Sequence, residues 1–321
     1  MTLNRRHAIA AGVATMAGLA ATSSGAQDYP RGVIKFVIPT PPGGGHDTMM
    51  RLIGQKLSER LGQPCIVESK PGASGAIAAQ TVAKAAPDGH TLLVGYSALL
   101  SNTVLMPKPG YTLEDFAPVS MLALTPIALG ISEKMAASTL RQFVAVAKTR
   151  SADISYASYG PGSGGHFVGE LFKMASGLDT VHVPYKGEAP ALLDVLSGQV
   201  QAVFASIGGV KRYPGQIRPL AVAAAQRSPS YPDVPTFAEL GYPEVDMPGW
   251  AGLFAPAKTP QSVINTLTRE INRIVLLPEI KSKMAELGFD TVGWEPARQS
   301  DFLKTQLEST RSLVDSGRVK L

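Results

Sequence analysis

Residues 33–61 read VIKFVIPTPPGGGHDTMMRLIGQKLSERL: a short apolar run, a loop rich in proline and glycine, and an amphipathic segment. The β-branched and aromatic side chains of Ile34–Pro39 predict a strand. The segment after the loop is expected to be a helix, because four apolar side chains recur at helical spacing: Met49, Ile53, Leu57 and Leu61. A strand, a loop and a helix within about 30 residues are typical of parallel sheets.

The same pattern recurs along the chain. A second unit runs from a strand at Ile66–Glu68 through a helix at Gly75–Ala85 to a strand at Thr91–Tyr96. This alternation predicts an α/β fold with two similar lobes, each built on a sheet that helices cover on both faces. The later predicted elements are strands Ile127–Ile131, Ile154–Tyr159, Val181–Tyr185, Ala202–Ser206 and Leu220–Ala224, and helices Leu140–Thr149, Phe167–Ser176, Ala189–Leu196 and Val263–Leu276.

Each half of the chain carries one glycine-rich loop directly after a predicted strand. These loops are Pro41–Gly45 and Gly160–Gly165. In parallel α/β sheets, ligands bind beyond the carboxyl ends of the strands, where the next helix begins with unpaired N–H groups and a partial positive charge. A carboxylate is the natural ligand of such a site. We therefore expect the two lobes to face each other across a cleft, with one loop from each side.

Two polar residues stand at the predicted helix starts. Ser163 has the chemistry of a helix cap and of an anion donor. Asp47 is acidic, so we expect it to cap its helix or to accept a hydrogen bond from a ligand hydroxyl, amine or water. His46 lies beside the first loop, where it either contacts an anionic ligand or faces solvent.

Composition excludes several classes of protein. The chain has 321 residues, 45% hydrophobic and 17% charged, which is typical of a globular protein of about two domains and excludes a disordered or collagen-like chain. Cys65 is the single cysteine, so a disulfide framework and a cysteine-rich metal site are excluded.

The first 26 residues are interpreted as a secretory signal. Arg5 and Arg6 precede a run of small apolar residues, and Ser24-Gly25-Ala26 suits cleavage before Gln27. No later apolar run approaches the ~18 to 20 residues of a membrane span. Without Met1–Ala26 the chain keeps 28 basic and 25 acidic residues, a net charge of +3, which gives no footprint for nucleic acid.

Signatures of catalysis are weak. Gly160–Gly165 fits the dinucleotide pattern G-x-G-x-x-G, but the acidic residue expected after the following strand is missing at Pro184-Tyr185-Lys186. His166 and Glu170 have helical spacing, which is more often a surface contact or a buried hydrogen bond than part of a metal site. We therefore expect no catalytic residue, cofactor or metal. A secreted nucleotide-dependent enzyme stays open as an alternative.

Several segments together resemble a known family. Together they cover essentially the whole mature chain. In their identity and order they resemble the receptors of tripartite tricarboxylate transporters, the Bug family. The segments are Pro41–Asp47, Glu68–Ala73, Ala86–Leu93, Tyr156–Ser158, Gly164–Phe172, His182–Gly187, Pro232–Thr236 and Leu253–Pro256.

The resemblance implies a periplasmic solute-binding protein of type II that is not an enzyme. Such a protein closes two lobes over a small carboxylate and delivers it to a membrane permease, here as an expected monomer. We expect lobe boundaries at 27–125 with 250–321 for the first lobe and 126–249 for the second. The chain would cross between the lobes near Thr125 and near Trp250.

The resemblance also indicates where the ligand binds. In such receptors the loop after the first strand and the loop that opens the Gly164–Ser176 helix hold the carboxylate groups, partly through backbone amides and bridging water. Carried over to this sequence, the expected ligand-binding residues are Pro42, Gly43, Gly44, Gly45, His46, Asp47, Tyr96, Ser97, Ser158, Tyr159, Gly162, Ser163, His166 and Ala205.

Three departures from the family pattern concern the ligand. His46 replaces the usual small hydroxyl residue or glycine, and Ala205 stands where an aspartate commonly follows Phe204. The segment Ser206–Gln216 is about two residues shorter than the family pattern. We expect all three to face the cleft.

The aromatic residues near the cleft bear on which acid is bound. Tyr96, Tyr159 and His46 would suit a flat acid through stacking. Each of the three could equally serve only as packing. The expected ligand is a small organic carboxylate, either a dicarboxylate or an aromatic acid. A ligand sensor for a membrane kinase is the third hypothesis, and the sequence does not separate it from transport.

Overall fold

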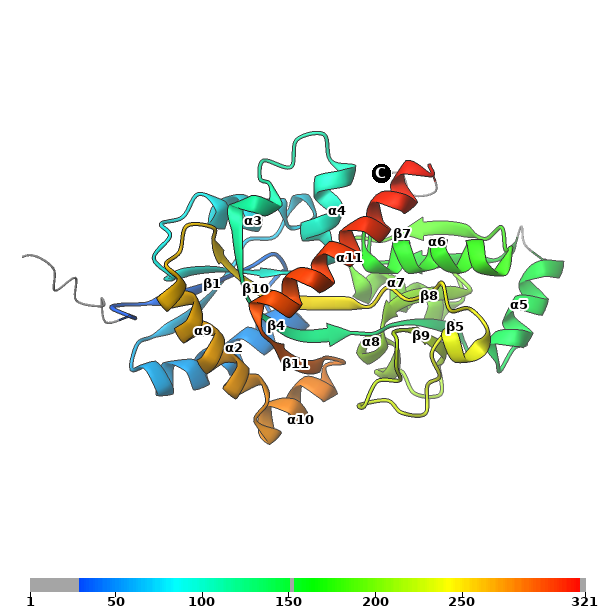
Figure 1. The fold of residues 1–321 in the computed structure, drawn as a ribbon. Coiled ribbons are helices and arrows are strands. Elements are labelled where there is room, and N and C mark those ends of the chain that lie inside the picture. The colour runs from blue at the N-terminus through cyan, green and yellow to red at the C-terminus, as the bar shows by residue number, and fades with distance from the viewer. Residues whose placement is uncertain (1–28, 151–152, 318–321) are drawn as a thin grey trace, which may run out of the picture.

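The computed structural model describes residues 29–150 and 153–317, which form two mixed sheets side by side (Figure 1). The predicted signal Met1–Ala26 lies outside the described residues. The first sheet has six strands in the order β11-β4-β10-β3-β1-β2, and the second has five in the order β7-β6-β8-β5-β9. We call the first sheet with its helices lobe 1 and the second sheet with its helices lobe 2.

Lobe 1 combines parallel and antiparallel strands. β1 pairs in parallel with β2 and β3, whereas β10 pairs antiparallel with β3 and β4, and β11 pairs antiparallel with β4. Its strands are β1 (Ile34–Ile38), β2 (Cys65–Ser69), β3 (Thr91–Gly95), β4 (Phe116–Thr125), β10 (Gly249–Pro256) and β11 (Asp290–Trp294), and its helices are α2 (Gly45–Leu61), α3 (Ala76–Ala83), α4 (Ser97–Leu105), α9 (Gln261–Val275), α10 (Pro278–Glu286) and α11 (Pro296–Asp315).

Lobe 2 has the same kind of sheet. β6 pairs in parallel with β7 and β8, and β5 pairs antiparallel with β8 and β9. Its strands are β5 (Ile127–Ser132), β6 (Ser155–Ser158), β7 (Val181–Pro184), β8 (Ala202–Ser206) and β9 (Ile217–Ala223), and its helices are α5 (Leu140–Thr149), α6 (Gly164–Ser176), α7 (Glu188–Ser197) and α8 (Ile207–Lys211).

Helices cover both faces of each sheet, because the strands are apolar on both sides. In β1, Phe36 packs with α2 and α9, while its neighbour Val37 packs with α3 and α4 on the opposite face. In β8, Phe204 packs with α6 and Ala205 with α7 and α8. Successive strand residues point to opposite faces, so each strand contributes to two cores.

Two crossings connect the lobes, and they lie next to each other. β4 ends at Thr125 and β5 begins at Ile127, while β10 begins at Gly249, which pairs with Thr125. The helix α11 also extends toward lobe 2: it contacts β4 and α4, and near its end Leu313 packs in the core of lobe 2. The boundaries at 125 and 250 stay predictions.

The local units predicted from sequence are present, and the antiparallel strands are the main difference. The helix over Met49, Ile53 and Leu57 buries those three side chains. The strands β4 and β11 and the helix α4 were not predicted. β4 is buried on both faces and carries Pro118, so its sequence shows neither alternating apolar and polar residues nor an uninterrupted β-branched run.

No helix among the described residues is long and apolar enough to span a membrane.

A pair of leucines near α9 tests the packing. Leu267 is fully buried in the core, whereas Leu276 is 44% exposed just after the helix. Leu267→Ala should lower the free energy of unfolding by about 2–5 kcal/mol, because it leaves a cavity. Leu276→Ala should change it by less than about 0.5 kcal/mol. Urea unfolding followed by circular dichroism measures both, and equal effects would contradict this packing.

Candidate functional site

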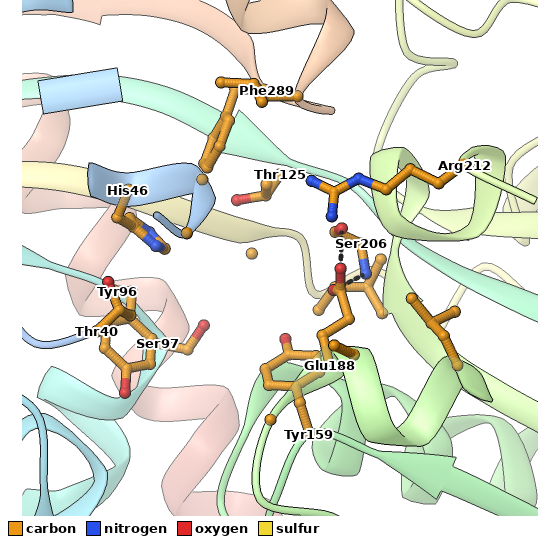
Figure 2. Close-up of a pocket in the computed structure, with 18 of the residues that line it drawn as sticks. Thr40, His46, Tyr96, Ser97, Thr125, Tyr159, Glu188, Ser206, Arg212 and Phe289 are labelled. Carbon is orange, nitrogen blue, oxygen red and sulfur yellow. Dashed lines mark hydrogen bonds between the residues drawn. The ribbon is translucent and has the colours of Figure 1, made fainter. Parts of the chain in front are cut away.

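A cavity of about 400 Å³ lies between the lobes beside the two crossings (Figure 2). Both lobes and the crossing strands contribute to its walls. The lining residues are Thr40, Gly44, Gly45, His46, Tyr96, Ser97, Thr125, Ile127, Tyr159, Gly187, Glu188, Ala189, Leu192, Ser206, Arg212, Tyr213, Gly249, Trp250, Leu287 and Phe289.

The first wall is built from the start of α2. Gly44 caps this helix without any side-chain hydrogen bond, and Gly44, Gly45 and His46 line the cavity. The first N–H groups of a helix have no acceptor within the helix and carry a partial positive charge. This wall therefore presents donors to the cavity without a basic side chain.

The negative charge of Asp47 does not oppose anion binding at this wall, because the neighbouring Gly43 amide and Arg51 balance it. Its Oδ2 accepts the Gly43 N–H at 3.0 Å and the Arg51 Nε–H at 3.0 Å, and its Oδ1 pairs with Arg51 Nη2 at 2.9 Å. The hydrogen bonds from Arg51 and Gly43 lower the pKa of the Asp47 carboxyl. The aspartate thus shapes the glycine loop and is balanced by an arginine outside the cavity.

A second helix begins at the same wall. α4 starts at Ser97 directly after β3, and Tyr96 caps it without a side-chain hydrogen bond. Tyr96 and Ser97 both line the cavity. Two uncapped helix starts from lobe 1 therefore face one space.

Three buried polar atoms of lining residues have no hydrogen-bond partner in the described structure: Thr40 Oγ1, His46 Nε2 and Trp250 Nε1. The His46 ring packs against Tyr96 and Phe289, with centroids 5.8 and 5.5 Å apart. Burial lowers the pKa of His46 to about 4, so its imidazole is neutral near pH 7. Buried polar groups normally have partners, so these atoms point to a polar ligand.

The opposite wall carries the charged residues. Glu188 opens α7, and its carboxylate accepts the Ser206 N–H at 2.8 Å and the Ser206 hydroxyl at 2.9 Å. The Arg212 side chain extends toward this pair from the end of α8 (Figure 2). Burial raises the pKa of Glu188, while the bonds to Ser206 and the charge of Arg212 oppose that rise.

The second glycine loop, Gly160–Gly165, does not line the cavity. His166 Nδ1 accepts the Gly162 N–H at 3.1 Å, and Ser163 Oγ accepts the His166 N–H at 3.3 Å. The Gly162 carbonyl accepts a hydrogen bond from Ser101 Oγ of α4 at 2.9 Å. The polar groups of this loop therefore bond His166 at the start of its own helix and Ser101 of lobe 1. Tyr159 lies between the loop and the cavity.

The structure separates the predicted site residues into two groups. Ser158 bonds His182 at 2.7 Å, and Ala205, expected at the cleft, lies in the core against α7 and α8 because β8 turns Phe204 the other way. A role in ligand binding stays a prediction for both groups. Lining the cavity are Gly44, Gly45, His46, Tyr96, Ser97 and Tyr159; away from it lie Pro42, Gly43, Asp47, Ser158, Gly162, Ser163, His166 and Ala205.

Several lining residues were not predicted. Glu188 follows a parallel strand and a glycine, as His46 does, so the rule used for the first loop would have found it. Arg212 and Phe289 carry no such signal, because each follows a helix and reaches the cavity only through the arrangement of the lobes.

Two α/β lobes joined by two crossings around a cavity define a solute-binding protein of the periplasmic type. Residues 49–317 match the tripartite tricarboxylate transporter family receptor. The chain belongs to this family.

Relatives cover the chain almost completely. BugT of Bordetella pertussis is 34% identical over 100% of both chains. The periplasmic binding protein BugD is similar in structure, with a TM-score of 0.79 and 27% identity over 91% of this chain and 100% of that one. Rpa4515 of R. palustris, determined with adipate, has a TM-score of 0.82 and 29% identity over 91% of this chain and 99% of that one.

The neutral His46 makes stability depend on pH. Its pKa is about 4 in the folded protein against an ordinary 6.5, so the unfolded chain binds more protons between these values. The melting temperature should therefore fall as the pH drops from 6.5 toward 4. His46→Phe keeps an aromatic ring against Tyr96 and Phe289 but does not titrate, so its melting temperature should fall less. Calorimetry across this range measures the slopes, and identical slopes would contradict the burial of His46.

Proposed function

We propose that this chain is a periplasmic receptor that captures a small organic carboxylate between its lobes and delivers it to a membrane permease. The observation that carries the proposal is the lobe 1 wall, where the starts of α2 and α4 face the cavity together with unpartnered polar atoms of Thr40 and His46. Among the described lining residues, only Glu188 and Arg212 are charged, and both belong to lobe 2. The carboxylate would lie against lobe 1.

Such a site can bind a carboxylate with micromolar affinity without a basic side chain. A hydrogen bond to a charged group contributes about 1.5–3 kcal/mol, and a helix start about 0.3–1 kcal/mol. Three or four such hydrogen bonds with two helix starts account for the ~8 kcal/mol of micromolar affinity.

The family supports transport over catalysis. Its description is that of a receptor, and the relatives include a periplasmic binding protein and a protein seen with adipate. The only histidine among the described lining residues is His46, and its Nε2 has no partner, so it does not activate Ser97 as a nucleophile. Export through Met1–Ala26 and action as a monomer belong to the same proposal.

The lobes contact each other at two places outside the cavity lining, which supports release by hinge opening. Ser101 of lobe 1 donates to the Gly162 carbonyl of lobe 2. Ser228 and Ser230 of lobe 2 donate to Asp290 Oδ1 of lobe 1 at 2.9 and 2.8 Å. A ligand would enter when the lobes separate about the crossings at Thr125 and Gly249.

A panel of organic acids tests the proposed function. At least one small carboxylate should raise the melting temperature, since a ligand that binds only the folded state stabilises it. Gly44→Val should abolish that rise: Gly44 lines the cavity, and its φ of −77° accommodates a side chain, so the variant should fold. Differential scanning fluorimetry with aliphatic and aromatic acids provides the measurement.

The control is Ala257→Val, which adds the same side chain at an exposed position outside the cavity and should keep the rise. No response to any acid in the panel would contradict the proposal. A response to NAD instead would favour the nucleotide-dependent enzyme.

The contact between Gly208 and the segment after α10 tests closure. A β-carbon at Gly208 would lie 2.6 Å from the Leu287 carbonyl oxygen and 2.6 Å from Gly288 Cα, so the lobes would have to move apart. Gly208→Ala should therefore weaken binding of the acid found in the panel at least about tenfold, with little change in the melting temperature of the free protein. Isothermal titration calorimetry measures the affinity. Unchanged affinity would show that closure does not need this contact.

A further inference from the structure

The two ends of the cavity differ in charge. The wall of lobe 1 presents amides, hydroxyls and a neutral imidazole, whereas the wall of lobe 2 presents Glu188 and Arg212 (Figure 2). A ligand with its carboxylate on lobe 1 places its other end against this pair. The chemistry of the pair therefore decides which acids fit.

Glu188 is held in one position but is not saturated. Ser206 donates to both carboxylate oxygens, through its N–H to Oε2 and its hydroxyl to Oε1. A carboxylate has about four acceptor sites, so about two are left. Glu188 lines the cavity, and no other hydrogen bond reaches its oxygens from the described residues.

Arg212 does not cancel the repulsion that Glu188 would exert on a second carboxylate. Arg212 lines the cavity but is exposed, whereas Glu188 is partly buried. Charges in solvent are screened more strongly than charges enclosed by protein. Burial raises the pKa of Glu188, and the bonds from Ser206 and the charge of Arg212 oppose that rise, so part of the attraction of Arg212 is used on Glu188. A second carboxylate placed here would mainly meet the negative charge of Glu188.

We propose that Glu188 selects acids whose end opposite the carboxylate carries a hydrogen-bond donor, a hydroxyl or ammonium group, over dicarboxylates of similar length. Such a donor fills a free acceptor site of Glu188, whereas a second carboxylate leaves that site unpaired and adds like-charge repulsion. The aromatic residues Tyr96, Tyr159 and Trp250 also line the cavity and suit a flat ligand. This inference rests on the proposed function and names the ligand class of the same cavity.

Matched acids test the selection. 4-Hydroxybenzoate and 4-(aminomethyl)benzoate carry a donor, terephthalate carries a second carboxylate, and benzoate carries neither; 6-hydroxyhexanoate and adipate form the flexible pair. Titration calorimetry at pH 7.5 should show the donor acids binding at least about tenfold more tightly than the dicarboxylate of the same set, because of the like-charge contact. The hydroxyl and ammonium arms show which donor Glu188 prefers.

Glu188→Gln removes the charge and keeps the shape of the side chain; its amide oxygen can accept from one of the two Ser206 donors, and the other donor loses its acceptor. The variant should reduce the preference for donor acids over dicarboxylates at least about tenfold. Glu244→Gln, an exposed acid of lobe 2 outside the cavity, should leave it unchanged. The melting temperatures of both free variants report whether they fold.

The outcomes are distinct. A wild-type preference for terephthalate or adipate that Arg212→Gln removes would overturn the inference and assign the far end to Arg212, while the proposed function would stand. An unchanged preference in Glu188→Gln would also overturn the inference alone. Binding of none of these acids, nor of any in the wider panel, would overturn the proposed function and the inference together.

Discussion

The first amides of α2 have no acceptor among the residues that the structure describes, and the rest of the site depends on this. They stay available because Gly44 has no side chain to cap the helix and because Asp47, the nearest acid, bonds Gly43 and Arg51. The glycines give access, the arginine outside the cavity balances the aspartate, and α4 adds a second uncapped start at Tyr96 and Ser97. A carboxylate can thus be bound by lobe 1 without a basic side chain, which leaves the ionic chemistry of the cavity to lobe 2.

The two glycine loops show that similar sequences in similar places need not do the same work. In the first loop the helix start faces the cavity, whereas in the second Gly162 donates to His166, Ser163 caps its own helix, and the Gly162 carbonyl receives Ser101 of lobe 1. The bond from Gly162 to His166 has a counterpart in the first loop, where Gly43 donates to Asp47, so the difference lies in the Ser163 cap and in the contact with Ser101. The second loop therefore joins the lobes, and Tyr159 presents its ring to the cavity.

The sequence predicts those elements whose structure depends on neighbouring residues in the chain. The strand, glycine loop and helix around Gly44 could be read from adjacent residues, whereas Tyr96 and Ser97 were assigned to the site through the family resemblance. The antiparallel β4, β10 and β11 could not, because their pairing joins segments far apart in the chain and leaves no periodic signal in any one of them. Phe289 and Arg212 reach the cavity through that pairing and through the contact between the lobes, so no motif marks them.

The proposed binding mode assigns recognition of an acid and discrimination among acids to different lobes. The amides of α2 and α4 are backbone groups, so substitutions that keep the glycines and the fold leave them in place. The far wall is made of the side chains of Glu188, Ser206 and Arg212 on α7, β8 and after α8, and a single substitution there changes its charge. If closure brings the two walls together as proposed, only an acid that suits both walls stabilises the closed state. In that mode, a substitution in lobe 2 would change which acid is bound while the amides of lobe 1 still bind its carboxylate.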